Sequence, residues 1–121
     1  MTKRILVVED HEDNRQILRD LLESAGYDMI EAEDGEQALT KAANYRPDMI
    51  LMDIQLPILD GYEAARRLKA DPTLKAIPII VVTSYALSGD EEKAYAAGCD
   101  AYVTKPYDPI ALLEMIRQQL G

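Results

Sequence analysis

The chain has 121 residues, which suits one compact domain over residues 1–121 and leaves no room for two. Its net charge of −9 argues against nucleic-acid binding, which needs a basic surface, and suits cations or basic protein partners. The single cysteine, Cys99, excludes an intramolecular disulfide. The apolar runs are too short for a membrane span or a secretory signal, so we expect a cytoplasmic protein that binds no membrane.

Five short apolar runs alternate with five amphipathic segments along the chain. The runs expected to form strands are 5–8, 28–32, 49–52, 79–82 and 101–103. Several are apolar throughout, which is typical of strands covered on both faces of a parallel sheet. Strand and helix alternating five times over predict an α/β fold, with one doubly wound parallel sheet and right-handed crossovers.

Apolar residues three or four positions apart predict the helical segments, and glycine or proline marks their limits. The first helix is expected to end at Gly26, the second before Pro47, the third at Asp71-Pro72 and the fourth, over 91–97, at Gly98, while the fifth begins at Pro109. The residues expected to face the core include Ile17, Leu18, Leu21, Leu22, Ala25, Ala38, Leu39, Ala42, Tyr45, Ala65, Leu68, Ile110, Leu113, Ile116 and Leu120.

Polar residues collect where the predicted strands end. In open α/β sheets, ligands bind beyond the carboxyl ends of the strands, where the strand order reverses. If the first and third strands are neighbours there, three carboxylates share one crevice, and their repulsion calls for Mg²⁺ or a lysine. An aspartate so placed can attack phosphorus and form an acyl phosphate. The residues at the strand ends are Glu9, Asp10, Asp53, Thr83, Ser84 and Lys105.

Four spaced segments resemble the receiver domain of bacterial two-component response regulators, over essentially the whole chain. The segments are VVED (7–10), LMDIQLPILDG (51–61), VVTSYA (81–86) and YVTKPY (102–107). The resemblance implies a flavodoxin-like fold with five helices and strand order 2-1-3-4-5. Within the family, MDIQLP together with GDEEKAYAAGCDAYVTKP looks most like stand-alone alphaproteobacterial cell-division receivers.

The resemblance also implies the residues of the phosphorylation site. Asp53 stands where the family has its phosphoacceptor, and Lys105 where it has the lysine that contacts the phosphoryl group. Glu9 and Asp10 match the acidic pair that holds Mg²⁺, with the backbone carbonyl of Gln55 as a further ligand. Glutamate replaces the more common first aspartate of that pair, so Glu9 is expected to reach the metal through water. The Lys105-Pro106 bond is expected to be cis.

The same resemblance implies a switch and a water path. Thr83 matches the switch hydroxyl, and Tyr102 matches the aromatic side chain that changes rotamer with it. Gln55 and Tyr85 are expected to flank the path of the hydrolytic water, and the bulk of Tyr85 to slow dephosphorylation. The face of the fourth helix, fifth strand and fifth helix is then the expected contact for a downstream protein. Its expected patch is Ala94, Tyr95, Ala97, Tyr102 and Tyr107.

The implied function is a Mg²⁺-dependent aspartyl-phosphate switch that is phosphorylated by a histidine kinase or a histidine phosphotransfer protein. The chain is not expected to be an enzyme beyond assisting its own phosphorylation and dephosphorylation. The alternative is an N-terminal receiver cut from a longer regulator. An aspartate-nucleophile phosphatase is disfavoured because Gln55 stands where such enzymes need a general acid. A nucleotide or flavin module is disfavoured because the turn at 9–13 is acidic and lacks glycine.

Simpler interpretations of single residues stay open from the sequence. Glu9 and Asp10 can be a helix-capping pair, because acidic residues suit helix N-termini. Thr83 can be an ordinary strand-end hydroxyl and Tyr102 a core residue. His11 is expected to be an exposed loop residue and not a phosphoryl carrier, because the donor histidine of this family belongs to a partner.

Overall fold

A computed structural model describes residues 2–84 and 90–120. Strands and helices alternate throughout, as the sequence predicts, and each strand lies within one residue of its expected limits. The elements are β1 (Arg4–Val8), α1 (Glu12–Ser24), β2 (Asp28–Ala32), α2 (Gly35–Tyr45), β3 (Met49–Met52), α3 (Gly61–Ala70), β4 (Ile79–Thr83), α4 (Asp90–Ala96), β5 (Ala101–Thr104) and α5 (Pro109–Leu120).

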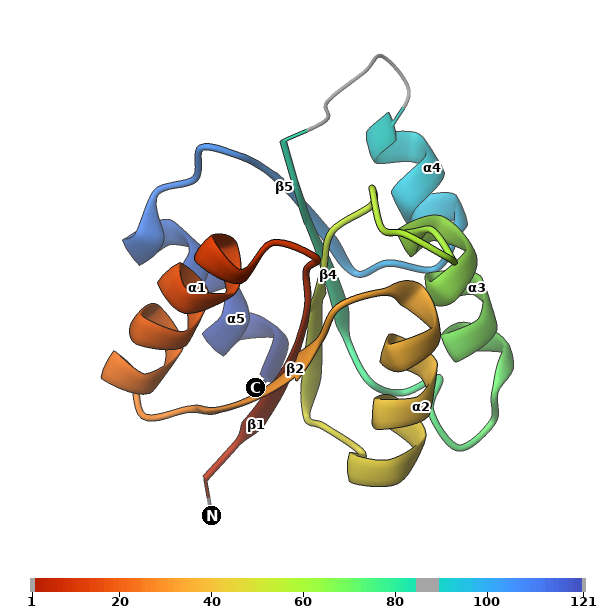
Figure 1. Ribbon diagram of the computed structural model, residues 1–121, viewed down its shortest axis with the longest axis horizontal. Helices are drawn as coiled ribbons and strands as arrows, with labels where there is room; N and C mark the ends of the chain where they lie inside the picture. The colour runs from red at the N-terminus through yellow and green to blue at the C-terminus, as the bar shows by residue number, and fades with distance from the viewer. Residues whose placement is uncertain (1, 85–89, 121) are drawn as a thin grey trace.

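The five strands form one parallel sheet in the order β2-β1-β3-β4-β5, which confirms the implied topology. Helices α1 and α5 cover one face of the sheet, and α2, α3 and α4 cover the other (Figure 1). The order reverses between β1 and β3, where Val8 pairs in register with Met52. The carboxyl ends of these two strands therefore lie side by side and carry Glu9 and Asp53 away from the sheet together.

Two apolar clusters, one on each face, form the core. Met49 and Met52 are both fully buried, as is expected for a strand covered on both sides. Ile17, Ala25, Tyr45 and Ile110 were expected to face the core, and this prediction is wrong, because all four are exposed. On α1 the buried positions are Arg15, Leu18 and Leu22. Arg15 and Ile17 lie on nearly opposite sides of the helix, so the buried stripe of α1 is turned toward Arg15 and away from Ile17.

The start of α3 fixes the chain that follows Asp53. The Asp60 carboxylate accepts a hydrogen bond from the Glu63 amide, 3.0 Å away, and caps this helix. Gly61 lies so close to the end of β3 that an added Cβ atom would stand 2.4 Å from the carbonyl oxygen of Asp53. Only glycine therefore allows α3 to begin against the backbone of Asp53. None of the helices among the described residues is long and apolar enough to cross a bilayer.

Candidate phosphorylation site

Asp53 follows β3 directly and lies at the point where the strand order reverses. Its amide donates a hydrogen bond to the carbonyl oxygen of Val8, 3.0 Å away, which ties the residue to β1. The amide of Gln55 approaches the carboxylate atom Oδ1 at 3.2 Å. The side chain is only 11% exposed. Asp53 thus lies at the opening of the crevice. The backbone of Val8 fixes its amide, and the amide of Gln55 contacts its carboxylate.

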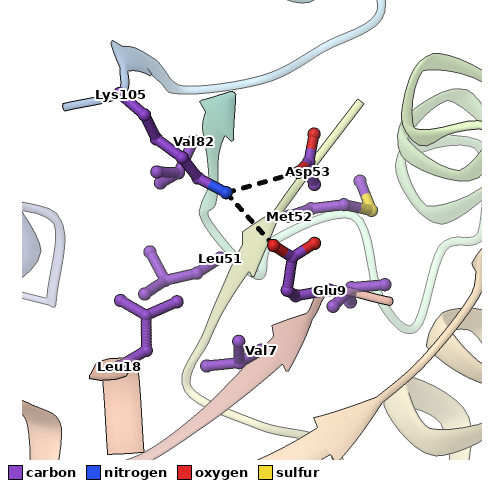
Figure 2. Close-up of a pocket in the computed structure, with 9 residues that line it drawn as sticks. Val7, Glu9, Leu18, Leu51, Met52, Asp53, Val82 and Lys105 are labelled. Atoms are coloured by element: carbon purple, nitrogen blue, oxygen red, sulfur yellow. Dashed lines mark hydrogen bonds and ion pairs between the residues drawn. The ribbon is translucent and has the colours of Figure 1, made fainter. Parts of the chain in front are cut away.

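Lys105 reaches across from the end of β5 and joins two carboxylates (Figure 2). Its ammonium nitrogen Nζ lies 3.1 Å from Oε1 of Glu9 and 3.4 Å from Oδ2 of Asp53. Burial alone would lower the pKa of Lys105, but the two carboxylates outweigh burial and raise it. Lys105 is therefore a positively charged group beside Asp53. The peptide bond between Lys105 and Pro106 is cis, as expected.

Glu9 is buried at the end of β1, and all of its polar groups have partners. Its amide donates to the carbonyl oxygen of Ala32, and its own carbonyl oxygen accepts from the Arg15 guanidinium. Its carboxylate accepts from the amide of Asp10 and from the side chains of Asn14 and Lys105. Burial, together with the charge of Asp53, raises the pKa of Glu9 despite the donors that favour its charged form.

The floor beneath these charges is apolar. A cavity of about 10 Å³ lies next to Glu9, Asp53 and Lys105, with room for roughly one water molecule. Its remaining walls are Val7, Val8, Leu18, Leu51, Met52 and Val82. Charges above such a floor interact more strongly than charges in bulk water, because the local dielectric constant is lower.

Asp10 lies at the rim of the crevice, 3.8 Å from the imidazole of exposed His11. Over residues 2–84 and 90–120, no three acidic, histidine or cysteine side chains converge as a ready ligand group for a metal ion. The donors nevertheless suit Mg²⁺, since Asp10, Asp53 and the Gln55 carbonyl offer only oxygen, and Mg²⁺ keeps several waters. Glu9 already accepts hydrogen bonds from Lys105 and Asn14, and its contact with the metal through water stays a prediction.

Thr83 and Tyr102 lie on the same face of the sheet. Val81 is in register with Tyr102 and precedes Thr83 by two residues, so all three side chains point to one side. Thr83 is fully buried, and half-buried Tyr102 packs against the apolar cluster beneath α4. The carbonyl oxygen of Thr83 also accepts from the amide of Lys105, at 2.8 Å. Tyr85, the residue expected to restrict water, lies outside the described residues.

The expected partner patch is wrong in part. Ala94 and Ala97 are buried against the core and offer no surface to a partner. Tyr95 is exposed, and Tyr102 and Tyr107 line a groove of about 210 Å³ on β5 and α5. Of the five residues expected in the patch, the three tyrosines therefore remain available to a partner.

Sequence reasoning missed two residues at the site, Asn14 and Arg15. Asn14 donates to the Glu9 carboxylate, and Arg15 donates to the Glu9 carbonyl oxygen. A signal for Arg15 was present, because it stands three residues before Leu18 and seven before Leu22, on their helical stripe. An arginine on an apolar stripe indicates a buried ion pair.

Comparison with known proteins supports one family. The family described as "Response regulator receiver domain" matches residues 5–117. A curated relative, the polar-differentiation response regulator DivK of Brucella ovis, is 46% identical over all of this chain and 98% of its own length.

Solved receiver structures share the fold. The receiver domain of a sensor histidine kinase from Pseudomonas aeruginosa PAO1 is 38% identical, with a TM-score of 0.92 over 100% of this chain and 99% of that one. That structure is described as having a magnesium ion coordinated in its active-site cleft. The chemotaxis response regulator CheY4 of Vibrio cholerae is 28% identical, with a TM-score of 0.90 over 98% of this chain and 99% of that one.

Proposed function

The chain belongs to the response regulator receiver family, and from this premise we propose that Asp53 accepts a phosphoryl group in a Mg²⁺-dependent switch. The donor would be the phosphohistidine of a histidine kinase or a histidine phosphotransfer protein. One observation carries the proposal: the Asp53 carboxylate lies at the strand-order reversal with the Lys105 ammonium 3.4 Å from it. We further propose that residues 1–121 form one receiver domain that acts in the cytoplasm.

In the transfer, an oxygen of Asp53 attacks phosphorus, and the bond from phosphorus to the imidazole nitrogen of the donor breaks. That nitrogen keeps the electron pair and leaves as part of a neutral or protonated histidine. Bound Mg²⁺, held by Asp10, Asp53 and the Gln55 carbonyl with Glu9 behind a water, would neutralise charge on the phosphoryl oxygens. Lys105, already charged beside Asp53, would bind one phosphoryl oxygen and position it.

Phosphorylation would alter the surface of α4, β5 and α5, and a downstream protein would read that change. The positions of Thr83 and Tyr102 support this route, since the two residues share one face of neighbouring strands at the end where Asp53 lies. The tyrosines Tyr95, Tyr102 and Tyr107 would supply the contact, because an aromatic ring with a polar tip suits a protein interface.

Phosphorylation of the purified chain by a small phosphodonor tests the proposal directly. With Mg²⁺, the intact mass should rise by one phosphoryl group, and Asp53→Asn should not gain it. Asp20→Asn, a change of the same kind on the exposed face of α1, should be phosphorylated as the unmutated chain is. Phosphoryl label on His11 in place of Asp53 would refute the mechanism.

Mg²⁺ binding is tested separately by thermal unfolding. At ten times its Kd, Mg²⁺ should raise the free energy of unfolding by about 1.4 kcal/mol, and Asp10→Ala should remove most of that gain. Coincident melts of the unmutated chain with and without millimolar Mg²⁺ would exclude this metal site.

Phosphoryl lifetime depends on the path of water to phosphorus. Gln55 is exposed and uncharged, so it can orient a water molecule but cannot act as a strong general base. Shielding by Tyr85 stays a prediction from the sequence: Tyr85→Ala should shorten the lifetime of the phosphorylated form without preventing its formation. A mutant that loses label at the same rate, or more slowly, would reject that role.

A further inference from the structure

Arg15 stands behind the acidic end of β1 and takes no part in the chemistry described above. Its side chain is 7% exposed, against 26% for Arg19 one helical turn further on. The guanidinium atom Nη1 donates to the carbonyl oxygen of Glu9 at 2.7 Å, and Nε donates to the Glu31 carboxylate of β2 at 3.1 Å. The second terminal nitrogen bonds Glu12 and lies 3.4 Å from the Glu33 carboxylate.

These contacts place one planar cation between three segments of chain. Arg15 belongs to α1, its carbonyl partner ends β1, and its carboxylate partners come from α1, from β2 and from the turn after β2. Lysine could not make these contacts together, because an ammonium is a single point and a guanidinium is a rigid fork with five donors. The three carboxylates offset the cost of burying the charge.

We propose that Arg15 is a positioning residue: it holds the Glu9 carbonyl so that the following peptide keeps Asp10 in place to bind Mg²⁺. The inference rests on the proposed function and adds a residue that is neither a ligand nor a phosphoryl contact. Groups that orient metal ligands from behind commonly change metal affinity by ten- to a hundredfold. Glu9 fits this role, because its amide, carbonyl and carboxylate are all bonded and its position is fully determined.

Simple electrostatics predicts the opposite result. Removing a positive charge near a cation site should tighten cation binding, because the repulsion between the two charges disappears. A positioning role predicts weaker binding once the carbonyl loses its donor. The sign of the change in Mg²⁺ affinity therefore separates the two explanations.

Arg15→Met and Arg19→Met make the matched comparison. Both remove one positive charge from the same helix and one partner from Glu31, but the hydrogen bonds of Arg19 go to Glu31 and Gln16 and not to the Glu9 loop. Calorimetric titration with MgCl₂ should show affinity about tenfold lower for Arg15→Met, and unchanged or higher for Arg19→Met. Affinity in Arg15→Met that equals or exceeds that of the unmutated chain would overturn the proposal.

A metal-free readout checks the same role independently. The Glu9 amide, bonded to the Ala32 carbonyl, should exchange its hydrogen faster in Arg15→Met than in Arg19→Met. Equal exchange rates in the two variants would count against positioning.

Arg15→Lys decides the matter if Arg15→Met does not fold. It keeps the charge without the fork, so a loss of affinity of roughly threefold or more supports the proposal, and unchanged affinity overturns it. Failure of the unmutated chain to bind Mg²⁺ would instead remove the proposed function, and this inference with it. Mg²⁺ affinity that is undiminished in Arg15→Met would remove only the role of Arg15.

Discussion

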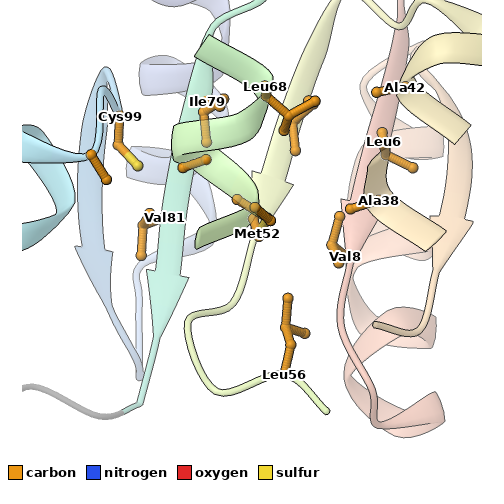
Figure 3. Packing of buried hydrophobic residues seen from close by; sticks show 14 of the residues in the cluster. Leu6, Val8, Ala38, Ala42, Met52, Leu56, Leu68, Ile79, Val81 and Cys99 are labelled. Carbon is orange, nitrogen blue, oxygen red and sulfur yellow. The ribbon is translucent and has the colours of Figure 1, made fainter. Parts of the chain in front are cut away.

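Cys99 lies in the apolar cluster that also holds Ile79 and Val81 (Figure 3). It is buried, as the sequence predicts for a lone cysteine in a domain of this kind. Burial, reinforced by the charge of Asp100, raises the pKa of the thiol from 9.0 to about 11. A thiolate does not form in the folded state at neutral pH, so this cysteine packs as a small apolar residue and is not a nucleophile.

This pKa shift predicts a pH-dependent stability. Because the folded state holds the proton more tightly, the contribution of Cys99 is fully present below pH 9 and is lost as pH rises toward 11. Between pH 8 and pH 11 the advantage of the unmutated chain over Cys99→Ala should shrink by about 2 kcal/mol. Urea unfolding of both proteins across this range measures it, and a constant difference would contradict the burial of the thiol.

Ile58 is the most unusual backbone position near the site. Its φ is +70°, a value that β-branched residues rarely adopt, and the Leu59 amide bonds to the Pro57 carbonyl oxygen across it at 2.7 Å. The side chain is 72% exposed, so its packing does not compensate for the strain. The loop between β3 and α3 keeps Ile58 in this unfavourable conformation, because Gly61 fixes the end of the loop against the backbone of Asp53.

Relief of this strain should stabilise the protein. Ile58→Asn should raise the free energy of unfolding by about 1 kcal/mol, because asparagine tolerates positive φ at less cost than a β-branched residue. The control is Ile17→Asn, which changes an isoleucine 57% exposed on α1, where the backbone is helical. Denaturant unfolding compares the two, and a gain that is absent at 58, or equal at both positions, would argue against strain.

At the scale of elements, Lys69 connects α3 to two other parts of the fold. Its ammonium donates to the carbonyl oxygen of Ile77 at 2.9 Å and to the Asp100 carboxylate at 3.1 Å, and also bonds the Lys75 carbonyl. Asp100 in turn accepts from the amide of Ile79 at the start of β4. The lysine thus joins the end of α3 to the loop before β4 and the turn before β5.

Removal of the Lys69 ammonium should lower the free energy of unfolding more than removal of an exposed charge does. Lys69→Met should lower the free energy of unfolding by about 1 kcal/mol, because the partly buried carbonyl of Ile77 loses its donor and the exposed Asp100 carboxylate loses its ion pair. Arg66→Met, on the same helix, removes only exposed pairs with Glu63 and should cost under about 0.5 kcal/mol. Equal losses in chemical denaturation would show that the Lys69 contacts contribute no more than a surface pair.

The elements differ in how far the sequence could predict them. Strand limits could be predicted because apolar runs such as 49–52 report burial on both faces without knowledge of neighbours. The rotation of α1 about its axis was not predicted, because Ile17 and Arg15 both extend the stripe of Leu18 and Leu22, on opposite sides of it. Arg15 is buried there only because Glu9, Glu31 and Glu33 meet it from other elements. A local sequence pattern cannot predict contacts with residues that are distant in the sequence.

In the candidate site, too, some features could be predicted from the sequence and others could not. The positions of Glu9, Asp53, Thr83 and Lys105 followed from strand ends and the resemblance, and the meeting of Glu9, Asp53 and Lys105 needed only the strand order. Specific contacts did not follow: Asn14 reaches Glu9 from the first turn of α1, and Ala94 and Ala97 turn inward on α4. These details depend on side-chain directions that only the packed helices define.

At the scale of the whole molecule, β4 and β5 connect the candidate phosphorylation site to the surface that carries Tyr95, Tyr102 and Tyr107. Buried Thr83 and half-buried Tyr102 share one face of neighbouring strands, and Val81 stands in register with Tyr102. Interiors are densely packed, so a side chain that moves there forces its neighbours to rearrange. Inward movement of Thr83 toward a phosphoryl group would therefore free space that the ring of Tyr102 can enter.

This coupling predicts which nuclear magnetic resonance signals move on activation. Addition of beryllofluoride and Mg²⁺, which stand in for the phosphoryl group, should shift amides around Asp53 and also amides across 90–109. Thr83→Ala should keep the first set of shifts and lose most of the second, because charge at Asp53 is still sensed locally but no hydroxyl carries it to β5. Thr40→Ala, on the exposed side of α2, should keep both sets. Shifts across 90–109 that persist in Thr83→Ala would mean that the signal travels another way, for instance through the Lys105 amide bonded to the backbone of β4.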